Sequence, residues 1–270
     1  MPDDIVIPAA REARPPRLAV LIDADNASHK IADGLFEEIA GLGEASVRRI
    51  YGDFSSPRSK GWTDLLARYA IVPQQQFAYT AGKNASDITL VIDAMDLLHS
   101  GRFDGFCLVS SDSDFARLAA RIREHGTDVF GFGEAKTPEA FRRACRRFIF
   151  TENLRTEPAA AAGGRRKRKS LGSPTDAAPL LAEVVTEAEG DDGWAPLDRM
   201  GTLIGNLQPD FDPRTYGHRK LSDLVRATDG FEVDGTDPRR VRVRKAPVEP
   251  APRSRATRRP SKRGRAKGST

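Results

Sequence analysis

The chain has 270 residues, a formal net charge of +5 at pH 7 and two cysteines. Cys107 and Cys145 lack any paired spacing, which argues against a disulfide framework and against a cysteine-based zinc site. No apolar run approaches the roughly 20 residues that span a membrane, and the acidic start is unlike a signal peptide. We therefore expect a cytoplasmic protein with no membrane association, long enough for a large core plus a small second domain.

Positive charge gathers in the second half of the chain. Lysine and arginine are dense at residues 165–169, 239–245 and 253–267. Such basic segments indicate a polyanionic partner, most commonly nucleic acid. The alternative interpretation is a solvated tail that only keeps the protein in solution.

Strand and helix patterns alternate from residue 18 onwards. Apolar runs and turn residues predict strands at 18–23, 47–54, 71–77, 106–110 and 128–132. Helical spacing predicts helices at 30–42, 62–69, 85–99 and 114–125, a loop at 79–84, and a last helix with Thr137 as its N-cap and Pro138 in its first turn. This order predicts an α/β fold with a mostly parallel sheet, right-handed crossovers and helices on both faces.

Carboxylates follow two of the predicted strands. Asp23 ends the first strand, and Asp112 and Asp114 come directly after the strand at 106–110. In open parallel sheets, ligands bind in the crevice beyond the carboxyl ends of the strands. These three side chains are therefore expected at one functional site.

The third predicted helix supplies a fourth carboxylate. At about 100° per residue, Asp87 shares a face with Leu90, Val91 and Ala94, in the first turn of an inward-facing side. Asp93 falls instead on a polar stripe, where it is expected to meet solvent or brace a neighbour. Asp87, and not Asp93, is thus the candidate for the site.

Clustered carboxylates repel one another unless a cation offsets their charge. Oxygen ligands suit Mg²⁺ or Mn²⁺, which keep several waters for substrate and nucleophile, so the cluster favours metal-assisted hydrolysis of a phosphodiester. Asn26 is placed to orient a phosphate or a water, and Lys83 to meet an anionic substrate. The structural alternatives are that Asp23 or Asp112 caps a loop or helix, and that Asp25 caps rather than ligates.

Three segments, at residues 21–26, 83–87 and 110–115, resemble the signatures of the NYN domain, a LabA-like branch of the PIN-like ribonuclease superfamily, in the family's order. The resemblance implies a PIN-like α/β/α sandwich and metal-dependent, endonucleolytic cleavage of RNA. It implies that Mg²⁺ or Mn²⁺ is held by Asp23, Asp87, Asp112 and Asp114, with Asn26 as their polar companion. Ser111 stands where many relatives carry Gly, and we expect it to contact the substrate.

A second unit is predicted from residue 178 onwards. Helices are expected at 180–185, 197–207 and 213–227, followed by a hairpin of 231–233 and 241–243. Three helices and a hairpin indicate a winged helix, and residues 178–245 resemble the OST-HTH domain, also called LOTUS, which implies binding of RNA or contact with a protein partner. The residues expected to bind RNA are Arg214, His218, Arg219, Lys220 and Tyr216, which is equally suited to the core.

The predicted organisation is a disordered segment at 1–16, a nuclease domain at 17–150, a flexible basic linker at 151–177, a winged-helix-like domain at 178–245 and a disordered basic tail at 246–270. We interpret the chain as a metal-dependent ribonuclease tethered to a module that brings single-stranded or structured RNA to it. The main alternative is a non-catalytic RNA-binding adaptor. A haloacid-dehalogenase-like phosphatase is a third hypothesis, because Asp23 and Asp25 match its nucleophile and acid, but Ala27 fits that family poorly.

Overall fold

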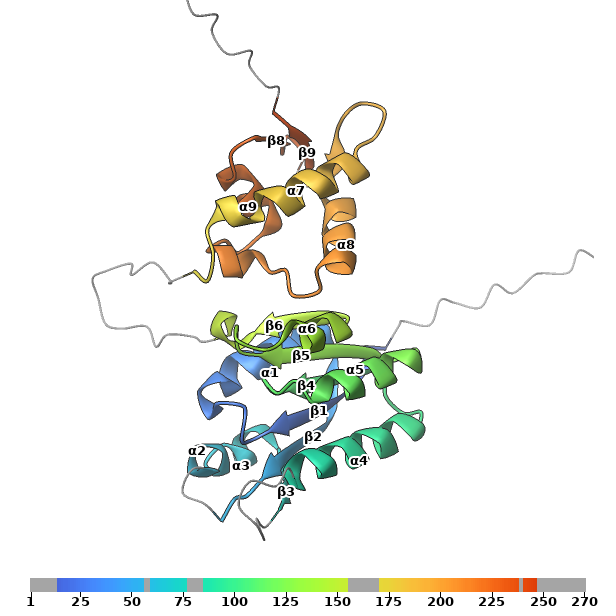
Figure 1. Ribbon diagram of the computed structural model, residues 1–270, viewed down its shortest axis with the longest axis vertical. Coiled ribbons are helices and arrows are strands. Elements are labelled where there is room, and N and C mark those ends of the chain that lie inside the picture. Colours follow the sequence, from blue (N-terminus) through green and yellow to red (C-terminus); the bar gives the residue numbers. More distant parts are fainter. Residues whose placement is uncertain (1–13, 56–58, 77–84, 155–169, 238–239, 247–270) are drawn as a thin grey trace, which may run out of the picture.

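The computed structural model describes residues 14–55, 59–76, 85–154, 170–237 and 240–246. Lys83, the basic run at 165–169, the tail after 246 and most of the N-terminal segment predicted to be disordered lie outside the described residues. Within the described ranges, no helix has both the length and the apolar character that a membrane crossing requires. Figure 1 shows an α/β domain and, above it, a smaller domain of helices with a short sheet.

Among the described residues, six parallel strands form the sheet of the larger domain, in the order β3-β2-β1-β4-β5-β6. They are β1 (Arg17–Asp23), β2 (Glu44–Gly52), β3 (Val72–Gln75), β4 (Gly105–Val109), β5 (Asp128–Gly133) and β6 (Arg147–Phe150). The chain lays β2 and β3 on one side of β1 and then places β4 on the other side. The strand order therefore reverses between β1 and β4, and the carboxyl ends of these two strands flank the crevice in which such sheets bind ligands.

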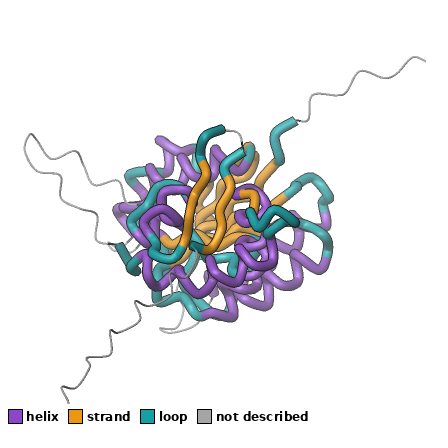
Figure 2. Tube along the Cα trace, turned by 90° about the horizontal axis from the view of Figure 1, so that it is seen from above, coloured by secondary structure: helices purple, strands orange, loops and turns teal. Residues whose placement is uncertain are grey.

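Helices surround the strands (Figure 2). They are α1 (Ala32–Leu42), α2 (Lys60–Thr63), α3 (Leu66–Tyr69), α4 (Ala85–His99), α5 (Phe115–Glu124) and α6 (Glu139–Ala144), with short 3₁₀ turns η1 (His29–Ile31) and η3 (Thr151–Asn153). In β1, Leu18, Val20 and Ile22 belong to the core beneath α1, whereas Ala19 and Leu21 belong to the core beneath α4 and α5. A strand buried on both faces needs an unbroken apolar run. The predicted α/β class, parallel sheet and two helical layers are confirmed.

Three local predictions for this domain differ from the structure. The strand β6, which only Cys145 and Arg146 separate from α6, was not predicted. The helix expected at 62–69 is two separate turns, α2 and α3, since a tight bond from the Leu65 N–H to the Trp62 carbonyl (2.9 Å) ends the first turn. Thr137 does not cap α6, because the extended Pro138 occupies the N-cap position itself and no side chain bonds there.

The smaller domain contains α7 (Pro174–Ala188), α8 (Leu197–Leu207) and α9 (Leu221–Ala227), with the 3₁₀ turn η4 (Pro213–Tyr216). Its sheet has the order β7-β9-β8, built from β7 (Ala195–Pro196), β8 (Phe231–Asp234) and β9 (Arg242–Lys245) in antiparallel pairing. The helix expected at 213–227 is broken at Gly217, whose φ of 84° lies in the left-handed region and ends the preceding turn. One core, containing Leu181, Met200 and Leu224, joins the three helices.

Gly34 and Gly41 offer a matched pair of substitutions on α1. A Cβ at Gly34 would overlap the main-chain oxygen of Leu154, whereas nothing lies within 4 Å of a Cβ at Gly41. We expect Gly34→Ala to lower the free energy of unfolding by about 1–3 kcal/mol, because the backbone must shift. Gly41→Ala should raise it by up to about 1 kcal/mol. Chemical denaturation measures both changes, and equal effects would contradict the close contact between α1 and the segment after β6.

Candidate functional site

Asp23, the last residue of β1, is the buried centre of the candidate site. Only 1% of it is exposed, and both carboxylate oxygens accept hydrogen bonds. Oδ1 accepts the main-chain N–H groups of Asp25 (3.0 Å) and Asn26 (3.2 Å). Oδ2 accepts the Asn26 side-chain amide (2.9 Å) and the Ser110 hydroxyl (2.7 Å). Burial raises the pKa of Asp23, and these bonds work against that rise by favouring the charged form.

The turn after β4 carries the next two carboxylates. The Ser110 oxygen accepts the Asp112 N–H (3.0 Å), and an Asp112 oxygen accepts the Asp114 N–H (2.9 Å). Asp112 is partly exposed and Asp114 is exposed, and the Asp114 side chain does not cap α5. Ser111 points to the next strand, since its hydroxyl accepts the Glu134 N–H just after β5 (2.9 Å). The turn therefore presents two carboxylates beside Asp23, while Ser111 joins the ends of β4 and β5.

Asp87, in the first turn of α4, lies in the field of the other carboxylates. Its pKa is raised to about 6, first by partial burial and then by the charges of Asp23, Asp112, Asp25 and Asp114. Such charge effects require the groups to be close in space. The structure thus brings together the four carboxylates expected from the sequence and adds Asp25.

Asp25 and Ser110 extend the predicted set. The Ser86 hydroxyl donates to an Asp25 oxygen (3.2 Å), which ties the loop after β1 to the start of α4. Sequence reasoning left Asp25 open between cap and ligand, and it missed Ser110 altogether. The only signal for Ser110 was its position directly after the buried run of β4, where a polar side chain meets the end of the neighbouring strand.

Asp93 has the bracing role expected from its helix phase. One of its oxygens accepts the Arg49 guanidinium (2.7 Å) and the Tyr51 hydroxyl (2.9 Å). Burial, together with the bond to Asp93, raises the pKa of Tyr51, so the phenol stays protonated. Asp93 therefore links α4 to β2 and stands outside the carboxylate site.

The donor chemistry of the site fits a hard divalent cation. Its candidate ligands are carboxylate oxygens, which suit Mg²⁺ and Mn²⁺. As the side chains stand, no group of three acidic, histidine or cysteine residues in the described part of the chain forms a metal-binding set. Repulsion between uncompensated carboxylates favours such separation. Asp23, Asp87, Asp112 and Asp114 would hold an ion if that repulsion were offset and the side chains closed on it.

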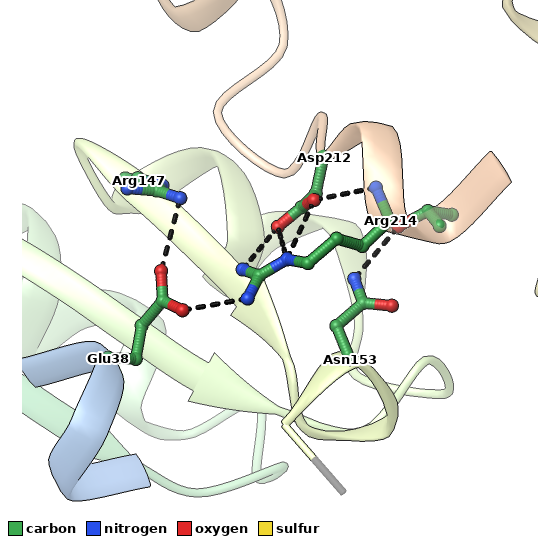
Figure 3. A network of polar contacts seen from close by, with 6 residues as sticks. Glu38, Arg147, Asn153, Asp212 and Arg214 are labelled. Atoms are coloured by element: carbon green, nitrogen blue, oxygen red, sulfur yellow. Dashed lines mark hydrogen bonds and ion pairs between the residues drawn. The ribbon is translucent and has the colours of Figure 1, made fainter. Parts of the chain in front are cut away.

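The RNA-binding residues expected in the second domain occupy different environments. Arg214 is bonded to two carboxylates, those of Asp212 and Glu38, as Figure 3 shows. Tyr216 packs against Phe211, with ring centroids 5.5 Å apart, and borders the core of its domain. His218 is half-buried. The two exposed cations of this group are Arg219 and Lys220.

Substitutions of Asp87 and Asp93, which both lie on α4, are expected to change the stability of the protein in opposite directions. Because the folded-state pKa of Asp87 is raised from 3.8 to about 6, metal-free protein should lose stability as the pH rises through this window. Asp87→Asn removes that loss, so it should raise the thermal unfolding midpoint at alkaline pH and have little effect under acid conditions. Asp93→Asn should lower the free energy of unfolding by about 1 kcal/mol, since it weakens the bonds to Arg49 and Tyr51.

Thermal unfolding followed by circular dichroism measures both variants across this pH range. A loss of stability in Asp87→Asn at alkaline pH would contradict the repulsive environment of that carboxylate.

Parts of this chain are similar to two solved structures. A protein of unknown function, VPA0982 from Vibrio parahaemolyticus, is 17% identical with a TM-score of 0.43, and the match covers 52% of this chain and 94% of that one. An uncharacterized protein from locus NE0665 of Nitrosomonas europaea is 33% identical with a TM-score of 0.24, over 33% of this chain and 85% of that one. No curated protein matches the sequence.

Family profiles divide the chain in the same way as its fold. The NYN domain profile matches residues 17–153, which contain the parallel sheet and the carboxylates. The OST-HTH/LOTUS profile matches residues 175–243, which contain α7, α8, α9 and most of the small sheet. NYN domains belong to a nuclease superfamily, and OST-HTH domains bind RNA. The chain therefore belongs to the NYN domain family and carries an OST-HTH/LOTUS domain after its NYN domain.

Proposed function

We propose that this protein is a ribonuclease that cleaves the RNA backbone with the help of Mg²⁺ or Mn²⁺ at the carboxylate site. The observation that carries the proposal is the placement of the carboxylates at the reversal of strand order, where buried Asp23 ends β1 and Asp112 and Asp114 follow β4. Partial burial, and then the charges of the other carboxylates, raise the pKa of Asp87 to about 6 beside them. Placing so many like charges together lowers the stability of the folded protein, because each charge destabilises the others. Such a cost is typical of sites built for function.

A phosphodiester cannot approach this cluster without a cation, since both partners are negative. A divalent ion bound there would polarise a phosphoryl oxygen and supply hydroxide near neutral pH. Asp23, Asp87, Asp112 and Asp114 would hold the ion, with Asp25 at its border. The Ser110 and Asn26 bonds keep Asp23 in one orientation, which preorganises the site for binding.

RNA is the substrate that the rest of the chain favours. The basic segments of the second half attract phosphates without reading sequence. The OST-HTH domain adds a module of an RNA-binding family. Tethering both to one nuclease domain raises the local concentration of RNA at the carboxylates. We extend the proposal to internal, endonucleolytic cleavage, in keeping with the family resemblance.

A second candidate function is a non-catalytic RNA-binding adaptor. It is favoured by one observation, that no three potential ligands among the described residues already form a metal-binding group. In that case the carboxylates would remain apart even when divalent ions are supplied.

Asp112→Asn separates these functions. It keeps the size of the side chain but removes one charge that a cation would need, so we expect cleavage of single-stranded RNA in Mg²⁺ or Mn²⁺ to fall at least roughly a hundredfold. Binding of the same RNA should be unchanged. Asp96→Asn is the matched control, because Asp96 is an exposed carboxylate on α4 outside the cluster. Gel-based cleavage and fluorescence anisotropy give the two readouts.

The outcomes point to different functions. Binding of RNA by the wild type without cleavage under either ion would support the adaptor. Hydrolysis of small phosphomonoesters, with no action on RNA, would support the phosphatase hypothesis in its place. Equal losses in Asp112→Asn and Asp96→Asn would contradict the assignment of the site.

A further inference from the structure

The OST-HTH domain contacts the free edge of the nuclease sheet. β6 is an edge strand, and edge strands leave main-chain groups without partners unless another segment covers them. Here the Phe148 N–H donates to the Pro209 carbonyl (2.8 Å), in the loop between α8 and η4. A segment of the other domain, 61 residues further along the chain, thus continues the hydrogen bonding of the sheet.

Ion pairs reinforce this contact on the side of α1. Arg214 of η4 pairs with Glu38 of α1 (2.8 Å), and the same carboxylate pairs with Arg147 of β6 (3.2 Å), as Figure 3 shows. The side chains of Arg214 and Glu38 are 24% and 17% exposed. Pairs that are mostly shielded from solvent and shared among several groups are worth more than isolated surface pairs.

A second set of bonds anchors the domain elsewhere along β6. Arg142 of α6 pairs with Asp210, whose side chain is 10% exposed. The Asn153 side-chain amide donates to the Thr215 hydroxyl (3.1 Å) at the carboxyl end of β6. The contact therefore has anchors on α6, on β6 and on the turn after it, which fixes orientation as well as proximity.

Arg214 has little capacity left for RNA in this arrangement. Its Nε and Nη2 donate to Asp212, at distances of 2.6–3.0 Å, and its Nη1 donates to Glu38. A guanidinium has five N–H donors in a fixed fork, and most of these are directed at carboxylates here. Its geometry suits the joining of two domains better than the binding of phosphates.

The docked domain brings half-buried His218 and exposed Arg219 to the carboxyl end of the sheet. His218 and Arg219 line a groove together with Glu152 and Asn153, which follow β6 directly. Asp112 follows β4 at the same carboxyl end of the sheet, two strands from β6. Because neighbouring strands lie about 4.8 Å apart, the ends of β4 and β6 are separated by roughly 10 Å.

Hydrogen bonds link the segments between these two ends. Ser111 bonds to Glu134 after β5 (2.9 Å), and the Ala135 N–H donates to a Glu152 oxygen after β6 (3.0 Å). Lys136 lies on this bridge, where it pairs with Glu134 (2.9 Å) while its side chain stays 76% exposed. A phosphate backbone that leaves the carboxylate site toward β6 would meet Lys136 and then Arg219.

The geometry points to a docked state in which the two domains form one RNA-binding surface, held by the Glu38–Arg214 and Arg142–Asp210 ion pairs. Arg214 is a positioning residue in this state. Lys136, Arg219 and Lys220 contact the backbone of an RNA strand that extends from the carboxylates. The inference rests on the proposed RNA function and deepens it, because docking turns two tethered sites into one preorganised surface.

Glu38→Arg tests the inference in the full-length chain. It places a third cation beside Arg214 and Arg147, so the free protein should become more extended in small-angle X-ray scattering. Its affinity for a labelled single-stranded oligouridylate, measured by anisotropy, should fall roughly threefold to tenfold although the protein has gained positive charge. Glu37→Arg is the matched control, since Glu37 is the exposed neighbour on α1 and the charge change is identical. The control should stay compact and bind RNA at least as tightly as the wild type.

Asp210→Asn provides a second, milder variant that loosens the other anchor, and it should shift both readouts in the same direction as Glu38→Arg. Thermal unfolding confirms that each variant is folded. A compact Glu38→Arg protein, or an extended one that binds RNA as tightly as Glu37→Arg, would overturn the docked surface. Failure of the wild type and of Glu37→Arg to bind RNA at low salt would overturn the RNA function as well, and the scattering data alone would then decide whether the domains dock.

Discussion

Electrostatic repulsion between carboxylates at the ends of β1 and β4 is the constraint around which the NYN domain is arranged. Asp23 is nearly completely buried, yet four hydrogen bonds to its two oxygens support its charge. Three of these bonds come from the loop that follows Asp23, two from its main chain and one from the Asn26 side chain, and the fourth comes from Ser110 directly after β4. The central pair of strands is therefore held together by the same carboxylate that the site requires.

The remaining carboxylates are placed by elements that this central pair supports. The turn after β4 presents Asp112, and the first turn of α4 presents Asp87. Partial burial, and then the charges of the neighbouring carboxylates, raise the pKa of Asp87 to about 6. A divalent cation would convert this repulsion into attraction, which is why stability and catalysis are expected to depend on the same ion. Among the described residues, the exposed Lys136, Arg219 and Lys220 are the cations proposed to hold phosphates along the docked surface.

Much of the NYN fold could be predicted from the sequence, because its signals are local. The unbroken apolar run of β1 requires a strand buried on both faces, and Asp23 follows it directly. The helix phase of α4 separates Asp87 from Asp93, and the structure gives Asp93 the bracing contacts with Arg49 and Tyr51. The strand β6 was missed although β3, also four residues long, was predicted; only Cys145 and Arg146 separate β6 from α6, so no turn residue marks its start.

Contacts between distant segments could not be predicted in this way. Arg214 is 176 residues from Glu38 in the sequence, and no spacing rule joins them. On its own, an arginine in a basic stretch of a winged-helix domain suggests phosphate binding, whereas the fold directs it toward two carboxylates. Ser110 is a similar case, since its role depends on the side-by-side pairing of β1 and β4. Gly217 did carry a local signal, because glycine readily adopts the left-handed backbone that ends a helical turn. Its φ of 84° breaks the helix expected there.

Paramagnetic broadening by Mn²⁺ in amide-resolved NMR spectra tests the central claim most directly. At substoichiometric Mn²⁺, the amide signals of Asp23, Asp87 and Asp112 should broaden first, because the ion is expected among their side chains. Asp104 and Asp128 lie at the amino ends of β4 and β5, at the opposite end of the strands. Their amide signals should remain sharp. Equal broadening at both ends of the strands, or broadening at Asp104 and Asp128 alone, would contradict a divalent-cation site at the carboxyl ends of β1 and β4.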